Sequence, residues 1–260
     1  MKEFILESKV VWRKSSQVNI ENHLYPSIFK DVSKKEAFLK DNFTFEIVDA
    51  TMEKMENFFL PLYYEEVASR KDFTLNKEGV LNDIKKKLGE RKYKLMLIYF
   101  EEKVIFGWFF CLRDNGLFMT YRAFNRNFDK KMSRKSPISY WAEEMLFKYG
   151  KEQGVEFFSH GKDTHPYINR SRLGLPLYKI KVGMSPKRAD NDPRVEKTVL
   201  KESEIIEKKV PLLFFSDADQ DGYYQKCYLY YPKGSLDDSY VNEFRKVIEW
   251  IGVGFIEKEY

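Results

Sequence analysis

The sequence contains only two cysteines, Cys111 and Cys227, and each lies inside an apolar, strand-like stretch. A disulfide framework needs several paired cysteines, so we expect two buried free thiols. Long apolar runs are also absent, because charged residues interrupt them before the roughly 20 residues of a membrane span are complete. The first eight residues have a short apolar run and an early carboxylate, which argues against a secretory signal. We therefore expect a cytoplasmic protein without a membrane span.

A long tract of Lys or Arg is missing as well. The net charge is +5, from 45 basic and 40 acidic residues, and it is spread through segments of mixed sign. This distribution does not favour DNA as a partner, and it suits a small anionic ligand better than tRNA. Aromatic residues make up 17% of the chain, which indicates a core and a pocket built from rings.

Apolar periodicity predicts most of the secondary structure. Strands are expected at 9–13, 43–48, 93–100, 104–112, 117–124 and 155–158, and a hairpin is expected from 211–215 and 222–231. Helices are expected at 33–39, 52–67, 75–88, 138–152, 201–209 and from 237 onward, and Pro61 either kinks the second of them or starts a new helix. The region around Tyr25 and Pro26 is expected to be irregular, and 186–198 to be a loop. Short connections between the strands at 93–124 predict an antiparallel meander.

Residues 115–184 carry most of the functional signal. A turn at Asn115-Gly116 starts a strand, and a basic loop with Arg126, Lys130, Lys131, Arg134 and Lys135 follows it. Ser136-Pro137 then suits the start of a helix. A strand, a helix and a parallel strand would form a right-handed crossover, whose helix N-terminus attracts phosphate at the carboxyl end of the first strand. The alternative is a solvated basic loop.

The segment Asp217–Gly222 matches the first six positions of a calcium loop. The twelfth position is Tyr228 instead of the bidentate glutamate, and strands flank the segment instead of helices. The pattern therefore favours a hairpin turn, and we expect no metal.

The order of strand, two helices, three-strand meander, basic loop, helix, strand, helix and strand resembles the GCN5-related N-acetyltransferase (GNAT) superfamily. The segment Tyr178–Gly183 resembles the aromatic-Lys-x-x-apolar-Gly signature of its FemAB-like branch, and the resemblance covers about residues 43–185. It implies an α/β (α+β) fold: a GNAT-like mixed central sheet with an antiparallel meander, a parallel splayed strand pair and helices on both faces. The expected domains are an N-terminal extension at 1–42, the core at 43–205, and a C-terminal hairpin and helix at 206–260.

The resemblance implies acyl transfer from acetyl-CoA or another acyl-CoA to an amine by direct attack. The donor would pair with the strand at Tyr121, Arg122 and Ala123, and a backbone N–H there would bind the developing oxyanion. The glycines of the usual pyrophosphate loop are absent, and residues 127–136 take their place. The side chains of Lys131, Arg134, Lys135 and Ser136 would then bind the donor's phosphates.

The same resemblance assigns the remaining site residues. Tyr178 would protonate the departing thiolate, and Lys179 matches the lysine of the FemAB-like branch. Asp163 or His165 would take the proton of the amine, since histidine titrates in the useful range. A cationic or sugar-like acceptor would contact Tyr63, Tyr64, Glu66, Tyr167 and Asn169.

Each assignment has a structural alternative. Tyr178 could be a core ring, Lys179 a surface lysine, Asp163 the cap of a short helix that starts near Thr164, and His165 a turn residue. Tyr63, Tyr64 and Glu66 could belong to an ordinary half-exposed helix.

Three functions fit the sequence. The first is an acyl-CoA-dependent N-acyltransferase acting on a small amine, such as an amino sugar or an amino acid. The second is an aminoacyl-tRNA-dependent transferase, as in the Fem ligases. The third is a degenerate acyltransferase fold that serves as a binding module.

Overall fold

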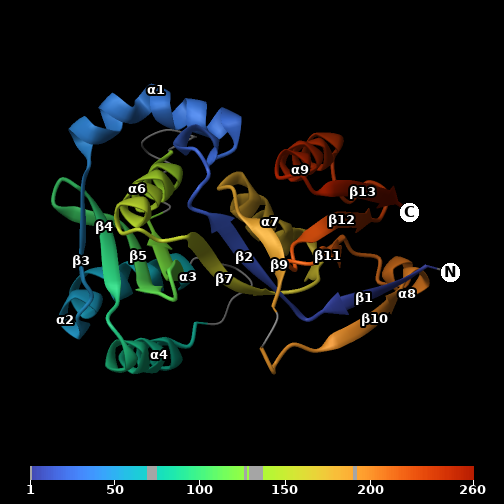
Figure 1. Cartoon of the computed structure of the whole chain (residues 1–260), viewed down its shortest axis with the longest axis horizontal. Helices are drawn as coiled ribbons and strands as arrows, with labels where there is room; N and C mark the ends of the chain where they lie inside the picture. Colours follow the sequence, from blue (N-terminus) through green and yellow to red (C-terminus); the bar gives the residue numbers. More distant parts are fainter. Residues whose placement is uncertain (1, 69–74, 126–127, 129–136, 190–191) are drawn as a thin grey trace. The chain divides into compact units, whose positions relative to one another are not determined.

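The computed structural model describes residues 2–68, 75–125, 128, 137–189 and 192–260. The chain divides into two compact units, which are described separately. The central unit comprises Pro26–Phe158, and the terminal unit comprises Met1–Tyr25 together with Ser159–Tyr260. Figure 1 traces both. The predicted domain boundaries at 42/43 and 205/206 follow a family resemblance and not compactness, and they stay a prediction.

The central unit contains the predicted meander. Its strands pair antiparallel in the order β3 (Thr44–Asp49), β4 (Lys94–Phe100), β5 (Lys103–Arg113) and β6 (Gly116–Phe124). Its helices are α1 (Pro26–Asn42), α2 (Met52–Lys54), a π-helical turn (Met55–Phe59), α3 (Leu60–Ala68), α4 (Lys77–Glu90) and α6 (Ile138–Glu152). The expectation of an irregular chain at Pro26 is wrong, because this proline starts α1 at a position where its missing N–H costs nothing.

Helices cover both faces of this sheet, as predicted. Leu95 and Leu97 of β4 belong to a buried cluster with residues of α3 and α4, such as Leu62 and Ile84. Phe110 of β5 contacts Tyr149 of α6 from the other face. The strands are apolar on both faces because each face is buried by a helical layer.

The predicted parallel pair starts as expected. The strand β7 (Phe157–Thr164) is the neighbour of β6, and α6 connects the two. At their beginnings, Glu156 N donates to Asn115 O at 2.6 Å and the Phe118 and Phe157 rings lie 5.4 Å apart. Gly116 permits this approach, since a Cβ there would lie 2.4 Å from the Phe157 ring. Only the first two residues of β7 belong to the central unit.

The terminal unit contains three groups of strands. The orders are β7-β2-β9, β8-β11-β12-β13 and β1-β10. The strands are β1 (Glu3–Glu7), β2 (Lys9–Ser15), β8 (Tyr167–Ile168), β9 (Ser185–Arg188), β10 (Lys197–Lys201), β11 (Leu212–Ala218), β12 (Tyr224–Tyr231) and β13 (Gly254–Glu259). The helices are a short 3-10 turn (Ile20–Asn22), α7 (Arg170–Lys181), α8 (Glu202–Glu207) and α9 (Asp238–Trp250). Asp217–Gly222 lies in the predicted hairpin between β11 and β12.

Several local predictions for this unit are wrong. The resemblance makes residues 177–183 the last strand of its element order, but residues 177–181 are the end of α7. Leu173, Leu177 and Ile180 form one buried helical stripe there. Asp163 and Thr164 do not cap a helix but end β7. The predicted loop at 186–198 contains most of β9 and the start of β10, both polar strands that pair with β2 and β1.

Both cysteines are buried free thiols, as predicted. Among the helices that the structure describes, none has the length and apolarity to cross a membrane.

Candidate functional site

A buried ion pair is the most distinctive polar feature of the terminal unit. Lys179, on α7, places Nζ 2.8 Å from Oδ1 of Asp163 at the end of β7. The same ammonium donates to the His160 carbonyl at 3.0 Å. Only 7% of the lysine side chain and 11% of the aspartate side chain are exposed. Lys179 is therefore not the surface lysine of its structural alternative.

Two neutral donors bind the other oxygen of this carboxylate. Trp12 of β2 donates Nε1–H to Oδ2 of Asp163 at 2.8 Å, and Tyr167 donates its hydroxyl to the same atom at 2.9 Å. The indole nitrogen also lies 3.1 Å from the Tyr167 oxygen. We call these four residues, Trp12, Asp163, Tyr167 and Lys179, the Lys179 cluster. With three donors around it, Asp163 is a poor choice for the base that the sequence suggested.

Burial controls the protonation of Tyr167. It raises the pKa of this phenol far above its ordinary range, and the neighbouring Asp163 carboxylate raises it further. Tyr167 therefore stays a neutral hydrogen-bond donor. Its hydroxyl binds Asp163, so a direct contact with the acceptor, as predicted, is no longer the simplest role.

Tyr178 lies beside Lys179 in sequence, on the same helix. It is half-buried, and its ring lies 6.4 Å from that of His160 on β7. Tyr178 is thus neither a fully buried core ring nor a fully exposed one. The predicted proton donor and the predicted lysine share one helix, next to the end of one strand.

The glycine of the signature has a structural reason. Gly183 follows α7 with φ of +76°, and its N–H bonds the Ile180 carbonyl at 2.8 Å, as a glycine does at a helix C-terminus. A Cβ at this position would lie 2.5 Å from the His23 carbonyl oxygen. The glycine therefore allows α7 to end against the 3-10 turn, while Lys179 stays one turn earlier on the helix.

His165 has a structural arrangement. Its Nδ1 lies 2.7 Å from the Glu7 carbonyl, and its Nε2 accepts the Phe215 N–H at 2.9 Å. Burial lowers the pKa of His165 to about 4. A neutral ring with both nitrogens bonded favours a structural role over that of a base. Asn169, predicted to bind the acceptor, is exposed at the N-terminus of α7, where its backbone N–H binds the Pro211 carbonyl.

The central unit contains three of the five predicted acceptor residues, Tyr63, Tyr64 and Glu66, and they lie near β6 with the predicted donor-binding residue Tyr121. Tyr121 donates its hydroxyl to Asp83 of α4 at 2.7 Å, and its ring meets that of Tyr63 edge to face at 5.4 Å. Tyr63 in turn contacts Tyr64, whose hydroxyl donates to the Lys77 carbonyl at 3.3 Å. Burial, and then Asp83, raises the pKa of Tyr121. The rings of Tyr63, Tyr64 and Tyr121 form one half-buried aromatic group. Tyr63 and Tyr64 lie on α3, directly after the π-helical turn.

Glu66 of α3 is a buried carboxylate near the end of β6. It is 5% exposed, and its Oε2 accepts the Phe124 N–H at 2.8 Å. Nearby, the β5–β6 register shifts, since Phe109 pairs with Tyr121 whereas Phe110 pairs with Met119. Thr120 is the extra residue of a β-bulge, which changes the course of the strand just before Tyr121, Arg122 and Ala123. The predicted donor-binding residues Lys131, Arg134, Lys135 and Ser136 lie outside the described residues.

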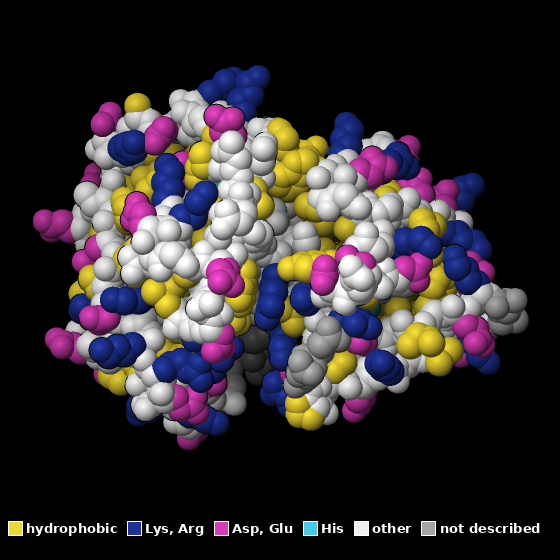
Figure 2. Space-filling model, in the orientation of Figure 1, with side chains coloured by type: hydrophobic (Ala, Val, Ile, Leu, Met, Phe, Trp, Pro, Cys, Tyr) yellow, Lys and Arg dark blue, Asp and Glu magenta, His cyan; other side chains and the backbone are white. Residues whose placement is uncertain are grey.

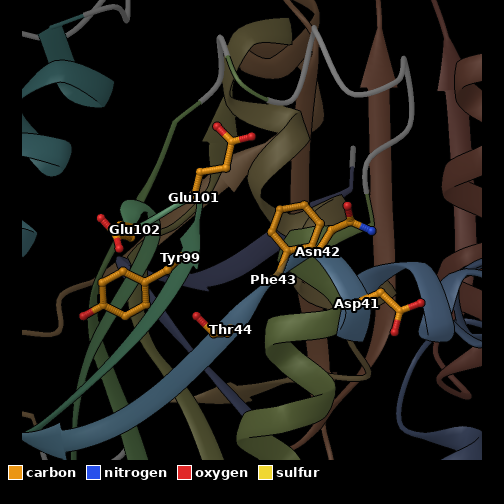
Figure 3. Close-up of a pocket in the computed structure, with 7 residues that line it drawn as sticks. All are labelled: Asp41, Asn42, Phe43, Thr44, Tyr99, Glu101 and Glu102. Carbon is orange, nitrogen blue, oxygen red and sulfur yellow. The ribbon is translucent and has the colours of Figure 1, made fainter.

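An open pocket of about 490 Å³ also lies in the central unit. Figure 3 shows its lining from the junction of α1 and β3 and from the β4–β5 turn, with carboxylates from Asp41, Glu101 and Glu102 and rings from Phe43 and Tyr99. None of the predicted site residues lines it. Within the described ranges, no group of three or more His, Cys, Asp or Glu side chains could hold a metal ion.

Sequence reasoning missed Trp12 and Asp83. Trp12 is 151 residues from Asp163, and its strand reads as ordinary core. No local pattern marks a buried indole as a hydrogen-bond donor to a distant carboxylate.

No family model matches the chain, and no curated protein matches it. Among solved structures, FemX is similar, with 12% identity over 68% of this chain and 59% of FemX and a TM-score of 0.51. A protein of unknown function from Bacteroides thetaiotaomicron has 10% identity over 76% of this chain and 62% of its own, with a TM-score of 0.46. L-PGS from Bacillus licheniformis has 11% identity over 62% and 46%, with a TM-score of 0.41. The chain thus spans less than two thirds of each of these proteins. The likeness to FemX shows a shared mixed α/β fold, as the element order predicted.

Proposed function

We propose that this protein is an acyltransferase that moves an acyl group from acyl-CoA to the amine of a small molecule by direct attack. One observation carries the proposal: the buried Lys179–Asp163 pair beside half-buried Tyr178. A buried ion pair adds little to stability compared with apolar residues of the same volume. A buried pair of charges whose contribution to stability is small therefore favours a chemical role.

The chemistry needs a stabiliser for the developing negative charge and a proton for the leaving thiolate. The Lys179 ammonium, fixed by Asp163 and the His160 carbonyl, is the positive charge that we assign to stabilisation. Tyr178, next to it on α7, is the proton donor that we assign to the thiolate, and the proton that the attacking amine loses then restores the phenol. Asp163 orients Lys179 and does not act as the base, because its carboxylate already accepts three hydrogen bonds.

The central unit supports donor and acceptor binding. The bulge at Thr120 precedes Tyr121–Ala123, where we place the donor's amide-rich arm. The aromatic group of Tyr63, Tyr64 and Tyr121 could receive a cationic or sugar-like amine, because ring faces attract cations and stack on sugars.

Aminoacyl-tRNA is the second candidate donor, and the fold shared with FemX favours it together with the FemAB-like signature. The charge distribution favours acyl-CoA. The net charge of +5 is spread through segments of mixed sign, and Figure 2 shows Lys and Arg side chains among those of Asp and Glu on the coloured residues of the visible face.

Ligand-induced stabilisation and turnover test the proposal together. Acetyl-CoA, longer acyl-CoAs, desulfo-CoA and charged tRNA are each added in a thermal-shift assay, and release of free CoA thiol is followed with a panel of amines. A ligand at 100 times its Kd stabilises the folded state by about 2.7 kcal/mol. We expect a shift with acyl-CoA and amine-dependent thiol release. A shift with charged tRNA alone would make the second donor the correct one, and no response to either would overturn acyl transfer.

A further inference from the structure

We infer that Trp12 and Tyr167 are positioning residues: they hold the Asp163 carboxylate so that it fixes the Lys179 ammonium for catalysis. The inference rests on the proposed function for the role of Lys179 in catalysis. Whether Trp12 and Tyr167 keep Lys179 in place can be measured without an activity assay. Tyr167 thereby changes from a predicted acceptor contact to a residue that acts through Asp163.

The geometry separates the two oxygens of Asp163 by role. Oδ1 faces Lys179 at 2.8 Å, whereas Oδ2 accepts from Trp12 at 2.8 Å and from Tyr167 at 2.9 Å. The carboxylate is thereby fixed on both sides, and its plane cannot rotate without losing at least one of these bonds. The ammonium of Lys179 also lies 5.8 Å from the centre of the Trp12 ring. Trp12 thus contacts both members of the ion pair.

Burial makes the two neutral donors necessary. Trp12 is fully buried, and Tyr167 is 3% exposed. A carboxylate removed from water needs hydrogen bonds in place of its hydration. The donors from β2 and β8 supply two of them and fix the carboxylate that binds Lys179.

Packing alone does not account for these two residue types. The Trp12 ring packs edge to face on Phe215 at 5.6 Å, a contact that a phenylalanine could also make. What only the native side chains supply is the indole N–H and the phenol O–H, and both are directed at one oxygen atom. A buried aromatic pair without these groups would fill similar space but leave the carboxylate unsatisfied.

The test uses two variants that each remove one donor and keep a ring, Trp12→Phe and Tyr167→Phe. The control is Tyr224→Phe, which removes a buried phenol oxygen that lies 3.4 Å from Oε2 of Glu7. Each protein is treated with acetic anhydride, and acetylation of Lys179 is measured by peptide mass spectrometry relative to exposed Lys208. We expect Lys179 to react about 10-fold faster in both donor variants and at an unchanged rate in the control. A lysine that Asp163 no longer fixes is more accessible to the anhydride.

An increase below about twofold in both donor variants, with a loss of thermal stability like that of the control, would overturn the inference. Tyr167→Phe removes a single oxygen atom and decides the outcome if Trp12→Phe does not fold.

Acyl-transfer kinetics separate this inference from the proposed function. Lower kcat at unchanged KM for acyl-CoA in both donor variants supports the two together. Faster Lys179 acetylation without acyl transfer by the wild-type protein supports the positioning and removes the proposed reaction.

Discussion

Removing one charge of the Lys179–Asp163 pair should cost far more stability than removing both. The pair is 2.8 Å apart with 7% and 11% of its side chains exposed, so solvent screens it weakly. Breaking a buried pair by removing one partner costs about 3–5 kcal/mol. Lys179→Met leaves Asp163 with two neutral donors, at 2.8 and 2.9 Å, so we expect the lower end, about 3 kcal/mol.

A double-mutant cycle measures this directly. The variants are Lys179→Met, Asp163→Asn and the two combined, and urea unfolding gives the free energy of unfolding of each. The combined variant buries no charge, so it should lose less stability than either single variant, which is at least about 3 kcal/mol less than the sum of the two single losses. Single losses below about 1 kcal/mol that simply add would mean that the pair is effectively solvated, and the reasoning from burial would be wrong.

Three further predictions follow from single residues. Burial lowers the pKa of His165 to about 4, so between pH 6.5 and 4 the unfolded state binds a proton that the folded state does not. As the pH falls from 6.5 to 4, the free energy of unfolding of the wild type should therefore fall by about 3 kcal/mol. Urea midpoints should lose this pH dependence in His165→Gln and keep it in His160→Gln. Gly150→Ala places a Cβ 2.4 Å from the Phe158 ring and should lower the free energy of unfolding by about 1–3 kcal/mol. Gly89→Ala has nothing within 4 Å of its Cβ and should raise it by up to about 1 kcal/mol. Similar urea midpoints for the two variants would contradict this prediction. Tyr178→Phe should lower kcat at least about tenfold with unchanged acyl-CoA affinity, and full activity would return Tyr178 to a packing role.

The meander and the crossover helix could be predicted because their patterns are local. Strands β4 and β5 are apolar on both faces, and α6 buries the regularly spaced Ile138, Trp141, Ala142 and Met145. Its predicted polar side is wrong in part, because Glu143 and Glu144 are buried as well. The start of α9 was also readable, since Asp237 accepts the Tyr240 N–H at 2.8 Å in the position of a helix cap.

The errors arose where tertiary pairing decides the structure. The end of α7 was assigned to a strand from the family's element order, and Pro176 inside the helix obscured the buried stripe. Strand β9 carries Pro186, Lys187 and Arg188, so its own residues do not predict a strand, and its pairing with β2 forms it.

The site shows the same division. Lys179 could be selected from a short signature and Asp163 from its place after a predicted strand. The sequence did not predict that Asp163 orients Lys179 instead of acting as the base. That role depends on Trp12, which local sequence patterns cannot connect to Asp163 or Lys179.

Amine-dependent release of CoA thiol, measured for the wild type and for Lys179→Met, tests the central claim most directly. We expect thiol release by the wild type that requires both acyl-CoA and an amine, and a loss of at least about 100-fold in kcat for the variant at unchanged acyl-CoA affinity. Equal rates for the two proteins would contradict the role of Lys179. Absence of acyl-CoA binding and of thiol release in the wild type would contradict acyl-CoA-dependent transfer itself.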